Sequence, residues 1–176
     1  MAVCAWMSIA GCTSSSAAAV GPSPSHSPPP PFVGGSPSNL ALKLAGGCGT
    51  TQVYKGGQPD WLTRAGDNNN PSDLPYFITS PANAAGFLFS YPLRSGAPSN
   101  PGNKILWVVG VPRDGNNLVV DAHPRGASTP VVHMSFEDNA SPGEIYPSEV
   151  DVPSPGCWHF DVTWGPNQTS VELVYA

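Results

Sequence analysis

Charged residues are scarce in this chain, and basic residues are the scarcest. Only 7 of 176 residues are Lys or Arg, against 12 Asp or Glu, so the formal net charge is −5. Charged residues make up 11% of the chain, whereas about 25% is usual for a globular protein. Nucleic acids and acidic lipid surfaces are bound by clustered Lys and Arg. Without such a cluster, we expect neither nucleic acid nor a polybasic membrane surface as a partner.

Long apolar runs, helical periodicity and catalytic motifs are also missing. No stretch approaches the roughly 20 apolar residues that a membrane helix needs. No window has a persuasive 3.6-residue apolar period, so we expect little helix beyond a turn near 60–64 or 81–86. The G-x-S-x-G, H-E-x-x-H, C-x-x-C and phosphate-loop patterns do not occur. We therefore expect no enzymatic activity and no cofactor.

What the chain does have is a distinctive beginning, M-A-V-C-A-W-M-S-I-A-G-C. Its end, Ile9-Ala10-Gly11-Cys12, resembles the lipobox of bacterial lipoproteins, in which an aliphatic and two small residues precede the cysteine. The resemblance implies that residues 1–11 are a signal peptide and that Cys12 carries lipid, which anchors the chain on the extracytoplasmic face of the cell membrane. The chain departs from the pattern in having no Lys or Arg before Cys12, although a basic start is expected. The alternative is an apolar N-terminus with an incidental cysteine.

A segment rich in Ser, Ala and Pro follows this cysteine. Residues 13–39 contain no Asp, Glu, Lys or Arg, and Pro28–Pro31 form a run. Proline runs favour an extended polyproline II rod, and Ser- and Gly-rich stretches are flexible. Such a composition buries too little apolar surface to fold. We therefore expect residues 12–39 to be a lipidated cysteine with a disordered linker, and residues 40–176 to be one domain.

Residues 40–176 have the pattern of an all-β domain. Segments rich in Val, Ile and aromatic residues are bounded by Gly, Pro, Asn and Ser. Their regular spacing favours an antiparallel sandwich or barrel. Predicted strands are 52–55, 76–79, 86–92, 104–111, 117–122, 131–136, 143–152, 157–164 and 170–175.

Two hairpins are predicted from turn residues between these strands. Asp114-Gly115 favours the positive φ angles of a tight turn and predicts that 104–111 pairs with 117–121. A second turn at 165–167 pairs the last two strands. Every second residue of 157–164 is apolar, so we expect one face to be buried; its inward residues are Trp158, Phe160, Val162 and Trp164, opposite Val171, Leu173 and Tyr175. The same register points Cys157, His159 and Asp161 away from the core.

The run P-G-C-W-H-F-D-V-T-W at 155–164 resembles the final hairpin of Ig-like modules in uncharacterised secreted bacterial lipoproteins. The resemblance implies an Ig-like antiparallel β-sandwich and carries no activity with it. With Cys4 removed in the signal peptide and Cys12 carrying lipid, Cys48 and Cys157 are the two cysteines left. An even pair in an oxidising compartment is expected to form a disulfide. That bridge would lie outside the core, unlike the bridge of antibody domains. Two buried thiols are the alternative.

Three groups of residues are candidate ligand sites. His159 and Asp161 share one strand face and, with His123 or His133, offer donors suited to zinc or copper; the competing interpretation is an ordinary polar outer face. Trp61 and Tyr146 lie beside turns and offer sugar-stacking rings, unless they are core residues as we expect for Trp107, Trp158 and Trp164. Asp67, Asn69 and Asp73 suit a loose calcium site or a solvated turn.

Together these features predict a membrane-anchored extracytoplasmic lipoprotein with a non-catalytic binding or envelope-organising β-domain. Its expected partners are the membrane, through the lipid anchor, and a cell-envelope polymer or protein. A secreted hydrolase acting on cell-wall material and a structural spacer module are the alternatives.

Overall fold

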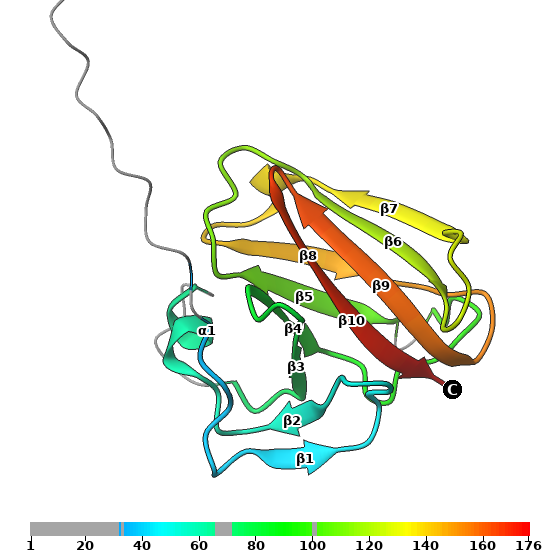
Figure 1. Cartoon of the computed structure of the whole chain (residues 1–176), viewed down its shortest axis with the longest axis horizontal. Helices are drawn as coiled ribbons and strands as arrows, with labels where there is room; N and C mark the ends of the chain where they lie inside the picture. Colours follow the sequence, from blue (N-terminus) through cyan, green and yellow to red (C-terminus); the bar gives the residue numbers. More distant parts are fainter. Residues whose placement is uncertain (1–31, 33, 66–71, 100–101) are drawn as a thin grey trace, which may run out of the picture. The chain divides into compact units, whose positions relative to one another are not determined.

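A computed structural model describes residue 32 and residues 34–65, 72–99 and 102–176 (Figure 1). The predicted signal peptide 1–11, the predicted lipidation site Cys12 and most of the predicted linker lie outside the described residues. The described residues from 32 onward belong to one folded unit.

Two antiparallel sheets make up this unit (Figure 1). The first has the order β1-β2-β3-β4-β5-β8, and the second has the order β10-β9-β6-β7. A short helix, α1 (Asp60–Ala65), and a 3-10 turn, η1 (Asp138–Ala140), complete the described elements. The strands are β1 (Leu42–Leu44), β2 (Val53–Lys55), β3 (Tyr76–Ile78), β4 (Ala84–Leu88), β5 (Lys104–Val109), β6 (Leu118–Pro124), β7 (Val132–Phe136), β8 (Ile145–Glu149), β9 (Gly156–Trp164) and β10 (Asn167–Tyr175).

The strand order confirms the predicted Ig-like antiparallel β-sandwich. In Ig-like folds, strands A, B and E form one sheet and strands G, F, C and C′ form the other. Here β4-β5-β8 correspond to A-B-E, and β10-β9-β6-β7 correspond to G-F-C-C′. Strands β1–β3 extend the first sheet beyond this common core. All the predicted strands occur, with shifted ends, whereas β1 was not predicted; two of its three residues are exposed, so its sequence carries no buried-strand pattern.

The core lies between the two sheets and is built from alternate residues of each strand. In β9, Trp158, Phe160, Val162 and Trp164 are buried, and the residues between them are exposed or half-buried. Trp107 of β5 is buried in the same cluster, with its ring 5.3 Å from that of Phe77. The predicted inward register of β9 is therefore confirmed, as is the core position of Trp107, Trp158 and Trp164.

One predicted hairpin is confirmed and the other is wrong. β9 pairs with β10 across Gly165-Pro166, with Trp164 opposite Asn167. Asp114 and Gly115 have the expected positive φ angles of 49° and 76°, but β5 and β6 lie in different sheets. A turn signal specifies a reversal of the chain and not a pairing partner. Both edges of β5 are already bonded, to β4 and to β8, so β6 crosses to the second sheet.

The outer edge of β10 is covered by three short segments that lie outside the named strands. Gly47 and Ser80 bridge to Leu173 and Ser170 in antiparallel fashion, and Leu93 bridges to Tyr175 in parallel. Exposed strand edges are sites of unwanted association, and covering them is one of the ways proteins avoid it. The N-terminal strands are thus joined to the second sheet along β10.

The predicted disulfide between Cys48 and Cys157 is confirmed, and it reinforces this junction. Its S–S bond links residues 109 positions apart. Cys48 N–H donates to the carbonyl of Glu172 on β10, and Cys157 lies on the non-core register of β9. As expected from that register, the bridge pins an N-terminal segment to the second sheet and does not join the two sheets through the core.

The folded unit includes residues before residue 40, the predicted start of the domain. The Phe32 ring meets the Trp61 ring edge-on at 5.3 Å, and Trp61 Nε1 donates to the Gly35 carbonyl. Ser38 N–H donates to the Gly57 carbonyl. The last residues of the predicted linker therefore pack on the domain, because the apolar Phe32 offers a contact that the Ser- and Pro-rich composition around it does not signal.

Removing the disulfide should lower the free energy of unfolding substantially. A crosslink that closes a loop of about 100 residues restricts the unfolded chain by up to about 4.7 kcal/mol, with about 2–4 kcal/mol typical. We expect a loss in this range for Cys48→Ala/Cys157→Ala, measured by guanidinium unfolding of the oxidised chain. A reductant should lower the wild-type midpoint and leave that of the double variant unchanged. Equal midpoints for the oxidised wild type and the double variant would contradict the expectation.

Candidate functional site

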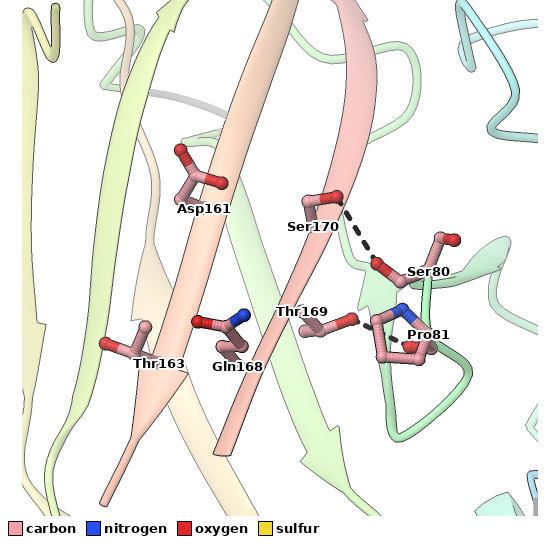
Figure 2. Close-up of a pocket in the computed structure, with 7 residues that line it drawn as sticks. All are labelled: Ser80, Pro81, Asp161, Thr163, Gln168, Thr169 and Ser170. Atoms are coloured by element: carbon pink, nitrogen blue, oxygen red, sulfur yellow. Dashed lines mark hydrogen bonds between the residues drawn. The ribbon is translucent and has the colours of Figure 1, made fainter. Parts of the chain in front are cut away.

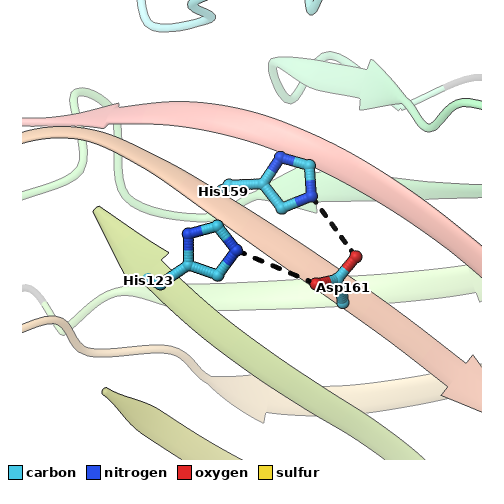
Figure 3. A group of neighbouring side chains, drawn as sticks. All are labelled: His123, His159 and Asp161. Carbon is cyan, nitrogen blue, oxygen red and sulfur yellow. Dashed lines mark hydrogen bonds and ion pairs between the residues drawn. The ribbon is translucent and has the colours of Figure 1, made fainter. Parts of the chain in front are cut away.

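The outer face of the second sheet carries a compact group of metal-ligating side chains. We call it the His–His–Asp cluster; its members are His123, His159 and Asp161, and one donor atom from each lies within 4.8 Å of the others. His159 Nε2 is 3.3 Å from Asp161 Oδ1, and His123 Nε2 is 3.9 Å from Asp161 Oδ2. Figure 3 shows both rings turned toward the one carboxylate. The predicted pair, His159 and Asp161, is thus brought together with His123.

Strand geometry explains this convergence. His159 and Asp161 are two residues apart on β9 and therefore project from the same side of the sheet. His123 on β6 is the direct register partner of His159. Directly paired residues on one face have Cβ atoms about 4.5–5.5 Å apart, and the two imidazoles stack with centroids 5.0 Å apart and planes 19° apart.

Each imidazole in the cluster has an acceptor near its other nitrogen. His123 Nδ1 is 3.1 Å from the carbonyl oxygen of Pro124. His159 Nδ1 is 3.7 Å from Glu172 Oε1, and Arg125 Nε donates to the same oxygen at 3.0 Å. The Nε2 atoms of both rings therefore face Asp161, while both Nδ1 atoms face acceptors on the backbone or on β10.

His133, the other histidine considered from the sequence, lies outside the cluster. It sits on β7, where its Nδ1 is 2.6 Å from Asp121 Oδ1, and its side chain is 69% exposed. The side chain of His123 is only 12% exposed. Asp121 is the register partner of Asp161 across β6 and β9. The outer face thus holds carboxylates on neighbouring strands, with imidazoles beside them.

A shallow hollow of about 250 Å³ adjoins the cluster at Asp161 (Figure 2). All its lining residues except Pro81 are of polar type, and they come from β9, from β10 and from the loop that covers the edge of β10. Ser80 and Ser170 join the two walls through mutual backbone hydrogen bonds. Sequence reasoning missed this hollow because Ser80 and Ser170 are 90 positions apart. Its lining residues are Ser80, Pro81, Asp161, Thr163, Gln168, Thr169 and Ser170.

The predicted sugar-stacking role of Tyr146 is wrong. Tyr146 is fully buried in the core, where its hydroxyl donates to the Asn116 carbonyl at 2.6 Å and the Arg113 guanidinium lies 5.3 Å from its ring centre. A sugar would have no face of this ring to stack on.

Trp61 does not present an open ring face either. Its side chain belongs to a buried cluster and is 8% exposed. Together with Arg64 of α1, it lines two open hollows of about 310 and 420 Å³. The ring is held by its edge-on contact with Phe32 and its bond to Gly35, so we expect no sugar platform there. Of the calcium candidates, Asp67 and Asn69 lie outside the described residues.

No family model, curated protein or solved structure matches this chain. Within the described residues, no helix has the length and apolar character that crossing a membrane requires. The strand order and the His–His–Asp cluster therefore carry the functional argument, and the class they define is an Ig-like β-sandwich with a polar, histidine-bearing outer face.

The buried tyrosines should make the fold sensitive to alkali. Burial raises the pKa of Tyr146 to about 12, and that of Tyr76 to about 12, from about 10 in the unfolded chain. The stability they contribute is complete below pH 10 and is lost as pH rises through 12. We expect unfolding midpoints to fall across this interval.

The variant Tyr146→Phe tests this assignment. It should cost about 1 kcal/mol at pH 8 through the lost hydrogen bond and should flatten the alkaline decline, because one titrating group is removed. Urea unfolding at a series of pH values measures both effects. If the free energy of unfolding of the variant falls with pH above 10 as steeply as that of the wild type, the role given to Tyr146 is contradicted.

Proposed function

We propose that this chain is a lipid-anchored extracytoplasmic protein whose β-sandwich is a non-catalytic binding module. The observation that carries the binding role is the outer face of the second sheet, where the His–His–Asp cluster and the adjoining hollow gather polar groups at one place. Core packing does not require these residues, since the inward register of β9 is filled by apolar side chains.

Two features support the extracytoplasmic location. The lipobox-like Ile9-Ala10-Gly11-Cys12 precedes the folded unit, and the Cys48–Cys157 bridge is of the kind that persists in oxidising compartments. Lipid at Cys12 would supply the anchor, because each buried methylene contributes about 0.8 kcal/mol and two or more acyl chains hold a protein stably. Tethering then raises the concentration of the module near its envelope partner.

Metabolic labelling with a fatty-acid analogue tests the anchor. In a bacterial host with lipoprotein processing, the wild-type chain should be labelled and should fractionate with membranes. Cys12→Ala should abolish the label and release the chain from the membrane fraction, because the acylated thiol is gone.

Cys4→Ala is the matched control for this experiment. It removes a cysteine from the predicted signal peptide, which is cleaved away, and should therefore leave the label of the mature protein intact. Equal labelling of wild type and Cys12→Ala, or no label in either, would remove the lipoprotein proposal.

Co-sedimentation with purified, insoluble cell-wall polymer tests the binding role. The full chain carrying Cys12→Ala should sediment with the polymer. Adding Thr163→Lys should weaken polymer binding at least about tenfold, equivalent to about 1.4 kcal/mol, because a long charged side chain then fills the hollow. Thr129→Lys is the control, since Thr129 is exposed in the β6–β7 connection and does not line the hollow.

The same experiment separates the alternatives. Soluble fragments released from the polymer would favour a hydrolase, and sedimentation of neither wild type nor control would favour a spacer. Equal retention of wild type and Thr163→Lys would move the binding surface away from the outer face of the second sheet.

A further inference from the structure

We infer that the His–His–Asp cluster is a binding site for a transition-metal dication, with Zn²⁺ and Cu²⁺ as the fitting ions. The inference rests on the binding role proposed above, because it names a ligand for the same face. It does not depend on the lipid anchor or on the polymer.

The donor set and its spacing fit such an ion. Two imidazole nitrogens and one carboxylate oxygen lie within 4.8 Å of one another. Zinc bonds to these atoms are about 2.0–2.2 Å long, so donors of a tetrahedral site lie about 3.3 Å apart. The His159–Asp161 contact, at 3.3 Å, already has this spacing. His123 Nε2 is 3.9 Å from the carboxylate, and the two rings are stacked with planes 19° apart, so closing the site takes a rotation of the exposed Asp161 side chain and a turn of the rings that aims both Nε2 atoms at the ion.

The environment of His123 supports a cation at its Nε2 atom. A carbonyl oxygen only accepts hydrogen bonds, so the contact of His123 Nδ1 with the Pro124 carbonyl requires the proton to be on Nδ1. In a neutral ring the lone pair is then on Nε2, the atom that faces Asp161. A positive charge between that nitrogen and the carboxylate, carried by a proton or by a metal ion, stabilises this arrangement. A metal ion at that position satisfies both groups.

His159 has the outer partners that metal-ligating histidines usually have. Such rings present their second nitrogen to a carboxylate or a carbonyl, which orients the ring and raises its basicity. His159 Nδ1 faces Glu172, and Glu172 is held in turn by Arg125. His123 uses the Pro124 carbonyl in the same way. Both histidines therefore present Nε2 to the Asp161 carboxylate, and each has an acceptor near Nδ1.

The chemistry of the ligands selects the class of ion. Imidazole suits zinc, copper and similar ions, whereas calcium and magnesium prefer all-oxygen sites. Asp161 is 56% exposed, so the ion would keep at least one coordination position open to solvent. Three protein ligands with one open position allow the ion to bridge the domain to an outside donor, such as a carboxylate or phosphate of an envelope polymer.

Isothermal titration of the full chain carrying Cys12→Ala tests this site. The chain, freed of metal with a chelator, is titrated with ZnCl₂ and CuCl₂, and with MgCl₂ for comparison. We expect one Zn²⁺ or Cu²⁺ per chain with micromolar affinity and no measurable Mg²⁺ binding. His123→Gln and His159→Gln should each weaken Zn²⁺ binding at least about tenfold.

His133→Gln is the matched control. His133 lies on the same face of the same sheet and contacts a carboxylate, but it is not a member of the cluster, so its loss should leave the affinity unchanged. His26→Gln, outside the described residues, controls for binding elsewhere in the chain. Pulsed EPR of the Cu²⁺-loaded wild type should show two imidazole nitrogens, and each cluster variant should show one.

The outcomes separate this inference from the function on which it rests. Unchanged Zn²⁺ affinity in both cluster variants, or equal weakening by His133→Gln, would overturn the site. Unfolding of each variant in EDTA shows whether a lost signal reflects a lost fold, and His159→Gln, which replaces the more exposed ring, tests the site again if His123→Gln does not fold. If the chain with an intact cluster binds neither Zn²⁺ nor Cu²⁺ but still binds the polymer, the metal site is refuted and the proposed function stands.

Discussion

The alternation of β9 is the constraint on which the rest of the structure depends. Successive side chains of a strand point to opposite faces, and a shift of one residue would exchange the two sets completely. With Trp158, Phe160, Val162 and Trp164 buried between the sheets, the residues between them must lie outside. The core therefore positions the disulfide cysteine, His159 and Asp161 on the outer face, although none of the three contributes apolar burial.

Closure along β10 is the second requirement, because an Ig-like sandwich leaves this strand at the edge of its sheet. Three separate segments bridge to β10, and the Cys48–Cys157 bond ties the first of them to β9. The same closure builds the wall of the hollow beside Asp161. Structural protection of an edge and the shape of the proposed binding surface thus have one origin.

The His–His–Asp cluster joins two strands that are distant in sequence. His123 and His159 meet because they are register partners on β6 and β9. Asp161 lies beside them because it is two residues from His159 on β9 and therefore projects from the same face of the sheet. The arrangement is rigid, since each ligand is on a strand of the sandwich, and it is open to solvent on one side. A metal ion held there would add a charged link between β6 and β9 and a point of attachment for an outside ligand.

Local pattern was enough to predict the all-β class, the positions of the Ig-like strands, the inward face of β9, the β9–β10 hairpin and the Cys48–Cys157 pair. Each of these depends on the pleat, on turn residues or on a count of cysteines, which neighbouring residues and composition reveal. The sequence also placed His159 and Asp161 on one face, for the same reason. Only the tertiary structure decided that β5 and β6 lie in different sheets, that Tyr146 is buried, and that His123 rather than His133 completes the cluster. These outcomes depend on which strands lie side by side, and that choice is made by the packing of the whole core.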